Sequence, residues 1–289
     1  MRLVNFSVEG RSTFGALVAD AVMDLRARLP GEATDLTTLL RTGGLAQARA
    51  LVEHATRDYA LGDVKIQNPA GRTRYFCIGV NYPERNEEYK DGSERPKYPS
   101  LFMRSHTSLV AHGEPIVRPR ESAQLDYEGE IVVVLASGGR RIPEAQALAH
   151  VLGYTCGNEG SVRDWLRHAK FNVTQGKNFD RSGSLGPWIV TSDEVGTAPL
   201  RVTTRVNGEL RQDDTSDRML FPIPYLIAYL SRFCTLEPGD VIFSGTPSGA
   251  GARFDPPRYL RPGDVVAVEV SSVGTLTNTV VDDAAPGPA

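Results

Sequence analysis

The chain has 289 residues, 40% hydrophobic and 23% charged, which is enough for one large domain or for a large and a small one. Its formal net charge of −3 without a basic stripe argues against nucleic acid as a partner, and no run of about 18 apolar residues is present to span a membrane. Three scattered cysteines, Cys77, Cys156 and Cys234, do not make a disulfide framework or a zinc cluster. The N-terminus lacks the apolar block of a signal peptide, so we expect a cytoplasmic globular protein.

Residues 1–70 predict a small N-terminal α/β domain. A turn at Glu9–Gly10 separates two strand-like stretches. The following segment, 35–57, has the pattern of two helices, and Asp35 and Thr37 are candidate N-caps for the first of them.

A domain boundary is expected near residue 70. The stretch "NPAGRTRYFCIGVNY", 68–82, begins with a Pro/Gly turn and continues as an apolar strand, so a second domain would cover residues 71–289. Residues 83–100 are polar, charged and rich in proline, without a clean period. We expect a long loop or a short helix there, of the kind that often forms a lid.

From residue 101 onward, strand and turn patterns dominate. Asn207–Gly208, between alternating residues, predicts a type I′ hairpin. Helices are expected at 143–151, at 161–170 and within 222–240, the last from apolar residues at helical spacing. Many strands with few crossover helices predict an α+β, β-rich domain instead of a doubly wound parallel sheet.

Three carboxylates alternate in the stretch "QLDYEGEIVVVL". In one strand Asp126, Glu128 and Glu130 would share a face, with neighbouring Cα atoms roughly 6.5–7 Å apart. The β-branched run of 131–135 predicts that this strand enters a buried sheet, where carboxylates need protonation or a cation. Oxygen ligands favour Mg²⁺, Mn²⁺ or Ca²⁺. A solvated acidic edge is the alternative, which the strand alone leaves open.

Further polar residues follow at turns. Glu159 occupies the turn of "GYTCGNEGSVRDW", and Arg163 is expected one turn inside a following helix. Lys177 lies in a Gly-flanked, strand-like stretch, and Thr246 lies in the Gly-rich loop of "GDVIFSGTPSGAG", whose N–H groups can bind a carboxylate. The cations either form structural ion pairs or hold the anionic end and the developing enolate of a metal-bound substrate.

Taken in order, these motifs resemble the fumarylacetoacetate hydrolase family, in its 2-oxo acid or 2-hydroxymuconate-type bacterial branch. The matching stretches are "IGVNY", "PSLFMR", "DYEGEIVVVL", "GYTCGNEGSVRDW", "GKNFD", "GPWIVT", "VNGELRQ" and "LEPGDVIFSGTPSGAG", which together span roughly residues 74–270. The resemblance implies a catalytic domain built as a mixed β-sheet roll, a small N-terminal domain and a homodimer.

The resemblance also implies the site. It assigns a divalent metal, Mg²⁺ or Mn²⁺, to Glu128, Glu130 and Glu159. Asp126 then becomes a neighbour of the ligands. Lys177 and Arg163 match the family's catalytic lysine and arginine, and Thr246 matches its substrate-binding threonine.

Three positions depart from the family pattern. Glu159 stands where most relatives have Asp, and Leu166 stands where they often have Gln. The lid of the family commonly carries His and, three residues on, Glu, as a pair that activates water. Here the matching residues are Arg85 and Glu88, and arginine does not act as a base near neutral pH.

By resemblance, the substrate is a small 2-oxo or 2,4-dioxo acid, such as an acylpyruvate or an aromatic ring-cleavage product. Hydrolysis of a C–C bond is the favoured reaction, with Glu88, His168 or His106 as the base. Arg85 and Arg104 are expected to clamp a second carboxylate of the substrate, although Arg85 could instead be a solvated charge on the lid. The alternatives are an isomerase or decarboxylase of a 2-hydroxymuconate-type dicarboxylate, and a catalytically inactive binding relative.

Overall fold

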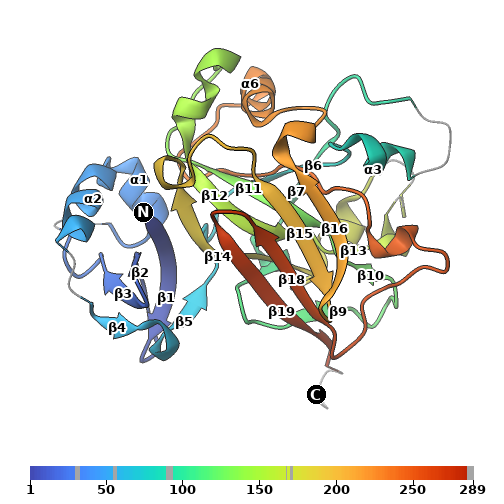
Figure 1. Ribbon diagram of the computed structural model, residues 1–289, viewed down its shortest axis with the longest axis horizontal. Helices are drawn as coiled ribbons and strands as arrows, with labels where there is room; N and C mark the ends of the chain where they lie inside the picture. Colours follow the sequence, from blue (N-terminus) through green and yellow to red (C-terminus); the bar gives the residue numbers. More distant parts are fainter. Residues whose placement is uncertain (30–32, 55–56, 89–93, 167, 170–171, 285–289) are drawn as a thin grey trace.

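The structure of the protein is a computed structural model that describes residues 1–29, 33–54, 57–88, 94–166, 168–169 and 172–284. Over these residues the fold is rich in strands and has mixed sheets, as predicted (Figure 1). No helix in this part of the chain is both long and apolar enough to cross a lipid bilayer.

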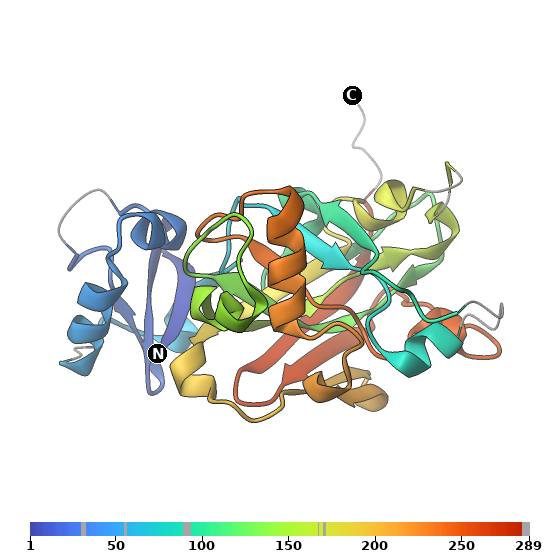
Figure 2. The same cartoon turned by 90° about the horizontal axis from the view of Figure 1, so that it is seen from above.

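The N-terminal elements lie together at one end of the molecule (Figures 1 and 2). They are β1 (Arg2–Val8), β2 (Arg11–Val18), β3 (Ala21–Asp24), α1 (Leu36–Arg41), α2 (Leu45–Glu53), β4 (Tyr59–Ala60), η1 (Leu61–Asp63) and β5 (Lys65–Gln67). The hairpin turn is confirmed, because Glu9 and Gly10 both have positive φ, at 50° and 76°. Asp35 is the N-cap of α1, since its side chain accepts a hydrogen bond from the backbone N–H of Thr38. Thr37 lies inside the helix, so its expected capping role was wrong.

One large sheet runs through the described part of the chain in the order β4-β3-β2-β1-β14-β12-β11-β17-β6-β7, with β5 on β1 and β8 on β14. Its further strands are β6 (Tyr75–Ile78), β7 (Leu101–Arg104), β8 (Leu109–Val110), β11 (Gly129–Leu135), β12 (Val151–Asn158), β14 (Gly183–Thr191) and β17 (Val241–Phe243). Because β1 pairs with β14, the N-terminal elements extend the same sheet, and the division near residue 70 stays a prediction. The parallel pairing of β17 with β6 makes the sheet mixed.

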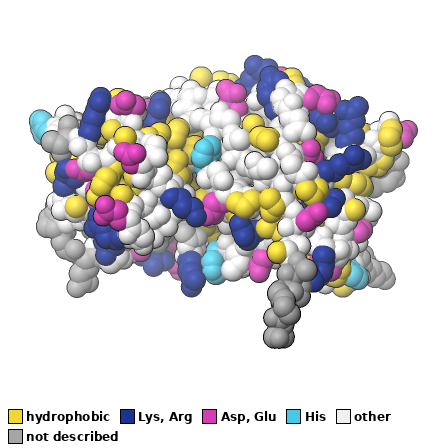
Figure 3. Space-filling model, turned by 90° about the horizontal axis from the view of Figure 1, so that it is seen from below, with side chains coloured by type: hydrophobic (Ala, Val, Ile, Leu, Met, Phe, Trp, Pro, Cys, Tyr) yellow, Lys and Arg dark blue, Asp and Glu magenta, His cyan; other side chains and the backbone are white. Residues whose placement is uncertain are grey.

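A second sheet has the order β16-β15-β18-β19-β9, and β10 pairs with β13 separately. The strands are β9 (Ile116–Arg118), β10 (Leu125–Asp126), β13 (Ser161–Val162), β15 (Arg201–Val206), β16 (Glu209–Thr215), β18 (Val265–Val270) and β19 (Gly274–Asp282). Positive φ at Asn207 and Gly208 confirms the predicted hairpin between β15 and β16. On the face drawn in Figure 3, side chains of both charge signs are interspersed.

Helical segments from residue 83 onward are short except for one. They are α3 (Pro83–Glu87), η2 (His106–Ser108), η3 (Glu144–His150), η4 (Arg163–Trp165), α4 (Thr174–Lys177), α5 (Ser192–Val195), η5 (Ser216–Arg218), α6 (Ile223–Phe233) and η6 (Gly251–Arg253). The helix within 222–240 is confirmed as α6, and 143–151 holds the 3₁₀ helix η3. The helix expected at 161–170 was wrong, because β13 and a single 3₁₀ turn replace it over the described residues. Lys177 ends a helix, α4, where a strand was expected.

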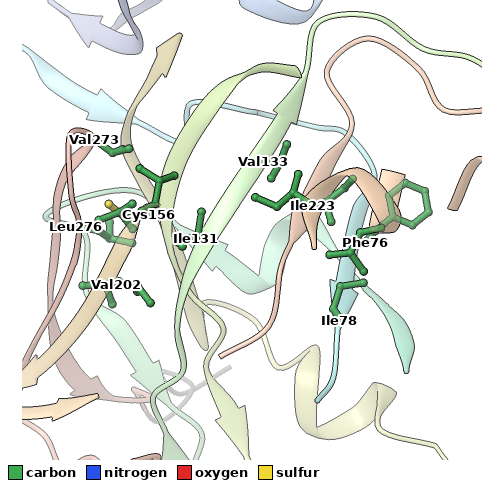
Figure 4. Packing of buried hydrophobic residues seen from close by; sticks show 14 of the residues in the cluster. Phe76, Ile78, Ile131, Val133, Cys156, Val202, Ile223, Val273 and Leu276 are labelled. Atoms are coloured by element: carbon green, nitrogen blue, oxygen red, sulfur yellow. The ribbon is translucent and has the colours of Figure 1, made fainter. Parts of the chain in front are cut away.

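Strand β11 is buried on both faces, as its hydrocarbon run predicts. Ile131 and Val133 pack into the core between the large sheet, the second sheet and α6, where Cys156, Val202 and Leu276 also lie (Figure 4). The alternate residues of β11, 132 and 134, pack on the other side against residues of α1 and the N-terminal strands. The acidic residues at the N-terminal end of this strand therefore lie in the protein interior.

Candidate active site

The end of β11 brings two acidic stretches together. Glu130 is the second residue of β11, and Glu159 directly follows β12, which pairs with β11 so that Gly129 faces Asn158. Glu128 lies between them, because its backbone C=O accepts a hydrogen bond from Glu159 N–H at 2.7 Å. Its own N–H donates to Asn158 Oδ1 at 3.0 Å. A tight backbone junction, and not one continuous strand, therefore positions the carboxylates.

Glu128, Glu130 and Glu159 form a buried cluster with the chemistry of a metal site. One oxygen from each lies within 4.8 Å of the others, and the three residues are 4%, 0% and 1% exposed. Glu130 Oε2 accepts a hydrogen bond from Gly245 N–H at 2.7 Å, whereas its Oε1 has no hydrogen-bond partner although it is buried. An orphaned buried oxygen beside two further carboxylates fits a hard divalent cation with oxygen ligands. These residues could hold such an ion, as the sequence indicates.

The pKa values of the three carboxyl groups in the cluster are shifted in different directions. Burial raises the pKa of Glu130 well above its usual value, and the neighbouring Glu159 and Glu128 raise it further. Burial also raises the pKa of Glu159, with Lys177 opposing the shift. Burial alone would raise the pKa of Glu128 too, but Arg163, Lys177 and Arg85 hold it well below its usual value. A divalent cation bound between the three carboxylates would favour their ionised forms.

Glu128 is the centre of a network of cations. Lys177 Nζ donates to its Oε2 at 2.5 Å, Arg163 donates to its Oε1 at 2.8 Å, and Arg85 donates to the same oxygen at 3.1 Å. Ser161 Oγ adds a hydrogen bond to Oε2 at 3.1 Å. The structure thus brings together three of the predicted polar residues around one predicted metal ligand.

Asp126 lies beside the cluster, as the resemblance implies. It belongs to β10, outside the large sheet, so the expectation that it shares one strand face with Glu128 and Glu130 was wrong. Its carboxylate accepts hydrogen bonds from Arg163 Nε at 2.8 Å and from the backbone N–H groups of Gly251 at 2.8 Å and of Ala252 at 2.9 Å. Asp126 therefore ties Arg163 to the glycine-rich loop.

Lys177 bridges two carboxylates. Besides Glu128, its ammonium donates to Glu159 Oε2 at 3.0 Å, and it lies 5.0 Å from the ring centre of Phe102, a contact that sequence reasoning missed. Burial lowers the pKa of Lys177, but Glu128 and Glu159 outweigh that effect and raise it. The side chain is therefore a proton-bearing cation at neutral pH.

The lid residues Arg85 and Glu88 are paired with each other. Arg85 donates to Glu88 Oε2 at 2.8 Å as well as to Glu128, and its side chain is only 2% exposed, so the idea of a solvated lid charge was wrong. Glu88 Oε1 accepts a hydrogen bond from Gly249 N–H at 2.7 Å, and the Glu88 side chain remains 18% exposed. The short helix α3 is thereby fastened to both the acidic cluster and the glycine-rich loop.

Two residues expected to bind substrate make structural contacts. Arg104 is fully buried and donates to Glu159 Oε1 at 3.4 Å and to Gly160 C=O at 2.7 Å. Thr246 donates to Gly129 C=O at 2.9 Å and accepts from Gln212, whose amide oxygen accepts from Gly129 N–H at 2.9 Å. Sequence reasoning missed Gln212, because the only signal at "VNGELRQ" is that of a hairpin strand.

The histidines proposed as bases lie outside this network. The ring of His168 is exposed and packs edge-on against Trp165, with ring centres 4.3 Å apart. His106 is half-buried in η2. Among the described contacts, none joins either imidazole to the acidic cluster, so a catalytic role for His168 stays a prediction without a supporting contact. Leu166 lies against Gly176 of α4.

Metal binding by this cluster is expected to become tighter as the pH rises. Glu130 and Glu159 have raised pKa values, so protons must leave them before a cation can be held. We expect the affinity for Mn²⁺ to increase from about pH 5.5 to about pH 8, with protons released on binding. Titration calorimetry in buffers of different ionisation enthalpy measures both quantities. An affinity that does not change over this range would contradict the assignment.

Comparisons with known proteins agree with the geometry. Residues 74–281 match the family model described as fumarylacetoacetate (FAA) hydrolase C-terminal. The oxaloacetate tautomerase YisK of Bacillus subtilis is 39% identical over 250 residues, covering 82% of this chain and 82% of its own. The mitochondrial oxaloacetate tautomerase fahd2 of Xenopus laevis is 34% identical and covers 97% of this chain and 90% of its own.

Solved structures share the whole fold. A putative HpcE protein from Mycobacterium smegmatis superposes with a TM-score of 0.87 at 32% identity, covering 98% of this chain and 100% of that one. The maleylpyruvate hydrolase of Sphingobium sp. SYK-6, in complex with manganese(II) and pyruvate, has a TM-score of 0.80 at 26% identity, with 98% and 100% coverage.

Proposed function

The chain belongs to the fumarylacetoacetate hydrolase family, and from this premise we propose that it is a metal-dependent tautomerase that interconverts the keto and enol forms of a 2-oxo dicarboxylic acid of the oxaloacetate class. Enzymes of this family are hydrolases, isomerases and tautomerases, so the reaction has to be argued from the residues of this site.

Arg85 is the observation that carries the proposal. It takes the place of the histidine in the family's water-activating pair, and it is buried against Glu128 and Glu88. A guanidinium has only donors and cannot take a proton from water. Hydrolysis needs a group that activates water, and of the family's pair only Glu88 remains. Tautomerisation moves a proton between C3 and the 2-oxygen, so it needs a base for the C3 proton but no activated water. A donor-only residue suits the second carboxylate of a dicarboxylate.

The metal ligands would be Glu128, Glu130 and Glu159, holding Mg²⁺ or Mn²⁺. When bound, the ion would supply Lewis acidity to the 2-oxo oxygen. The relative solved with manganese(II) and pyruvate supports this choice of metal.

Each remaining charged residue has a task in this reaction. Lys177, already protonated, donates to the 2-oxygen, where negative charge develops as the enol forms, and supplies its proton. Glu88 accepts the proton that leaves C3. A carboxylate has about four acceptor positions, and among the described residues Arg85 and Gly249 donate to that of Glu88. One proton passes from carbon to Glu88 and one from Lys177 to oxygen. Exchange with solvent then removes the proton from Glu88 and returns one to Lys177, so no other reactant is consumed.

Hydrolysis of an acylpyruvate is the second candidate, because Glu88 is retained on the lid and a maleylpyruvate hydrolase has the same fold. The distinguishing experiment follows the ultraviolet absorbance of enol-oxaloacetate with metal-stripped protein and with protein reloaded with Mg²⁺ or Mn²⁺. We expect interconversion only after reloading, with no C–C cleavage of acylpyruvates. Cleavage of an acylpyruvate with incorporation of oxygen from isotopically labelled water, and no tautomerisation, would replace the proposal with the hydrolase.

A further inference from the structure

Resting on the proposed metal site, we propose that Arg104 is a positioning residue that holds the carboxylate of Glu159 in the orientation for metal binding. Arg104 is the last residue of β7, and its side chain has no exposed surface. The sequence suggested that Arg104 clamps the substrate, which stays a prediction. In the structure Arg104 contacts Glu159, one of the candidate metal ligands, and neutral acceptors around it.

The guanidinium of Arg104 occupies a fitted socket. Its Nε donates to Ser108 Oγ at 3.0 Å, one Nη donates to Gly160 C=O at 2.7 Å, and the other donates to Ser182 Oγ at 2.9 Å. These acceptors are all neutral. Glu159, at 3.4 Å, is the carboxylate in ion-pair contact with this buried cation among the described residues, and it therefore supplies the charge that such burial requires.

The socket is closed by backbone that only glycine permits. A Cβ at Gly160 would lie 1.8 Å from Ser182 O, and a Cβ at Gly183 would lie 3.1 Å from an Nη of Arg104. The guanidinium is held beside Glu159 by its hydrogen bonds to Ser108, Gly160 and Ser182. In a fixed position it constrains the side chain that it touches.

The two cations that contact Glu159, Arg104 and Lys177, differ in how firmly they are held in place. Arg104 contacts Oε1 from its closed socket, whereas Lys177 contacts Oε2 and is shared with Glu128. Lys177 can turn to a substrate without leaving Glu159 free, because Arg104 remains. The guanidinium thus keeps one ligand oriented while the lysine acts.

Arg104 also accounts for a glutamate at position 159. The longer side chain has one more rotatable bond than the aspartate that the family pattern predicts, and this additional freedom would loosen a ligand. The fixed contact to Arg104 removes it. Glu159 and Arg104 should therefore act as a coupled pair in metal binding.

The test is a double-mutant cycle with Mn²⁺ affinity measured by calorimetry and folding measured by circular dichroism. We expect Arg104→Met to lower Mn²⁺ affinity by about 10- to 100-fold, with partial recovery in Arg104→Lys. In a Glu159→Asp background the same change should cost much less. The control Arg201→Met removes an exposed arginine that is also paired with a carboxylate, Asp213, and should leave the affinity unchanged.

If Arg104→Met does not fold, Ser182→Ala removes one partner of the guanidinium, keeps its charge, and should give a smaller loss of Mn²⁺ affinity. Wild-type affinity in a folded Arg104→Met with a lower melting temperature would overturn the inference, as would losses that add fully with Glu159→Asp. Failure of the wild-type protein to bind Mn²⁺ would instead remove the proposed function itself.

Discussion

Replacing Glu130 by glutamine is expected to abolish metal binding and, in metal-free protein, to increase thermal stability at alkaline pH. Glu130 offers the orphaned oxygen of the acidic cluster, and a neutral amide is a poor replacement for a carboxylate on a hard cation. The loss of Mn²⁺ affinity should be at least about 100-fold, the upper end of what residues outside the ligand shell cause.

The stability effect follows from the direction of the pKa shift. The pKa of Glu130 is raised in the folded protein, so the folded state holds more protons than the unfolded state at pH values between the two pKa values. Stability is therefore lost as the pH rises through that window. Glutamine does not titrate, so Glu130→Gln should melt higher than wild type at about pH 8 and gain little at about pH 5.

Melting curves with a chelator at both pH values, together with Mn²⁺ calorimetry, check this result. Glu144→Gln is the matched control, because Glu144 is exposed in η3 and should change neither quantity. A difference in melting temperature between Glu130→Gln and wild type that is the same at both pH values would show that Glu130 is not held with a raised pKa. Retained Mn²⁺ binding would remove it from the ligand set.

The buried strand and the acids Glu128 and Glu130 at its mouth could be predicted because their signals are local, whereas Glu159 was assigned to the metal only through the family resemblance. A β-branched run at 131–135 requires burial on both faces, and carboxylates at its mouth require protonation or a cation. The structure confirms the burial of β11 inside two cores, and it places one oxygen each of Glu128, Glu130 and Glu159 within 4.8 Å of one another.

The helix at 161–170 could not be excluded from local pattern. "SVRDWL" has residues compatible with a helix, but Val162 pairs with Leu125 across β13 and β10 and fixes an extended backbone. Arg163 then starts only a 3₁₀ turn, from which it reaches both Asp126 and Glu128. The pairing of β13 with β10 therefore determines the conformation of this segment, which local propensity does not.

The partners of the arginines were equally hidden. Arg85 and Arg104 were both expected to hold a substrate carboxylate. The sequence shows that an arginine on a lid or after a strand is charged, but it does not show which group its side chain contacts. Their contacts join residues 43 and 55 positions apart along the chain. Such pairs depend on the strand order of the large sheet, in which β7 and β12 are not neighbours. The spacing of residues along the sequence does not predict that order.

Replacing Lys177 by methionine is expected to lower kcat by about 10²- to 10³-fold, the usual cost of losing one donor to a developing oxyanion. The ammonium is the proton-bearing group that both Glu128 and Glu159 hold, and methionine keeps much of its hydrocarbon volume against Phe102. Turnover of enol-oxaloacetate measures the effect. Lys65→Met, at an exposed lysine paired with Glu114, is the matched control and should keep wild-type turnover.

Metal affinity separates this role of Lys177 from a structural one. In metal-free protein, Lys177 competes with a metal ion for Glu128 and Glu159, so its removal should leave Mn²⁺ affinity unchanged or increase it. Turnover would then fall while metal binding does not, the result expected of a group that acts on the substrate. If turnover and Mn²⁺ affinity fell together, Lys177 would only be ordering the carboxylates, and the proton at the 2-oxygen would have to come from another donor. Arg85 and Arg163 could not supply it, because a guanidinium keeps its proton in proteins.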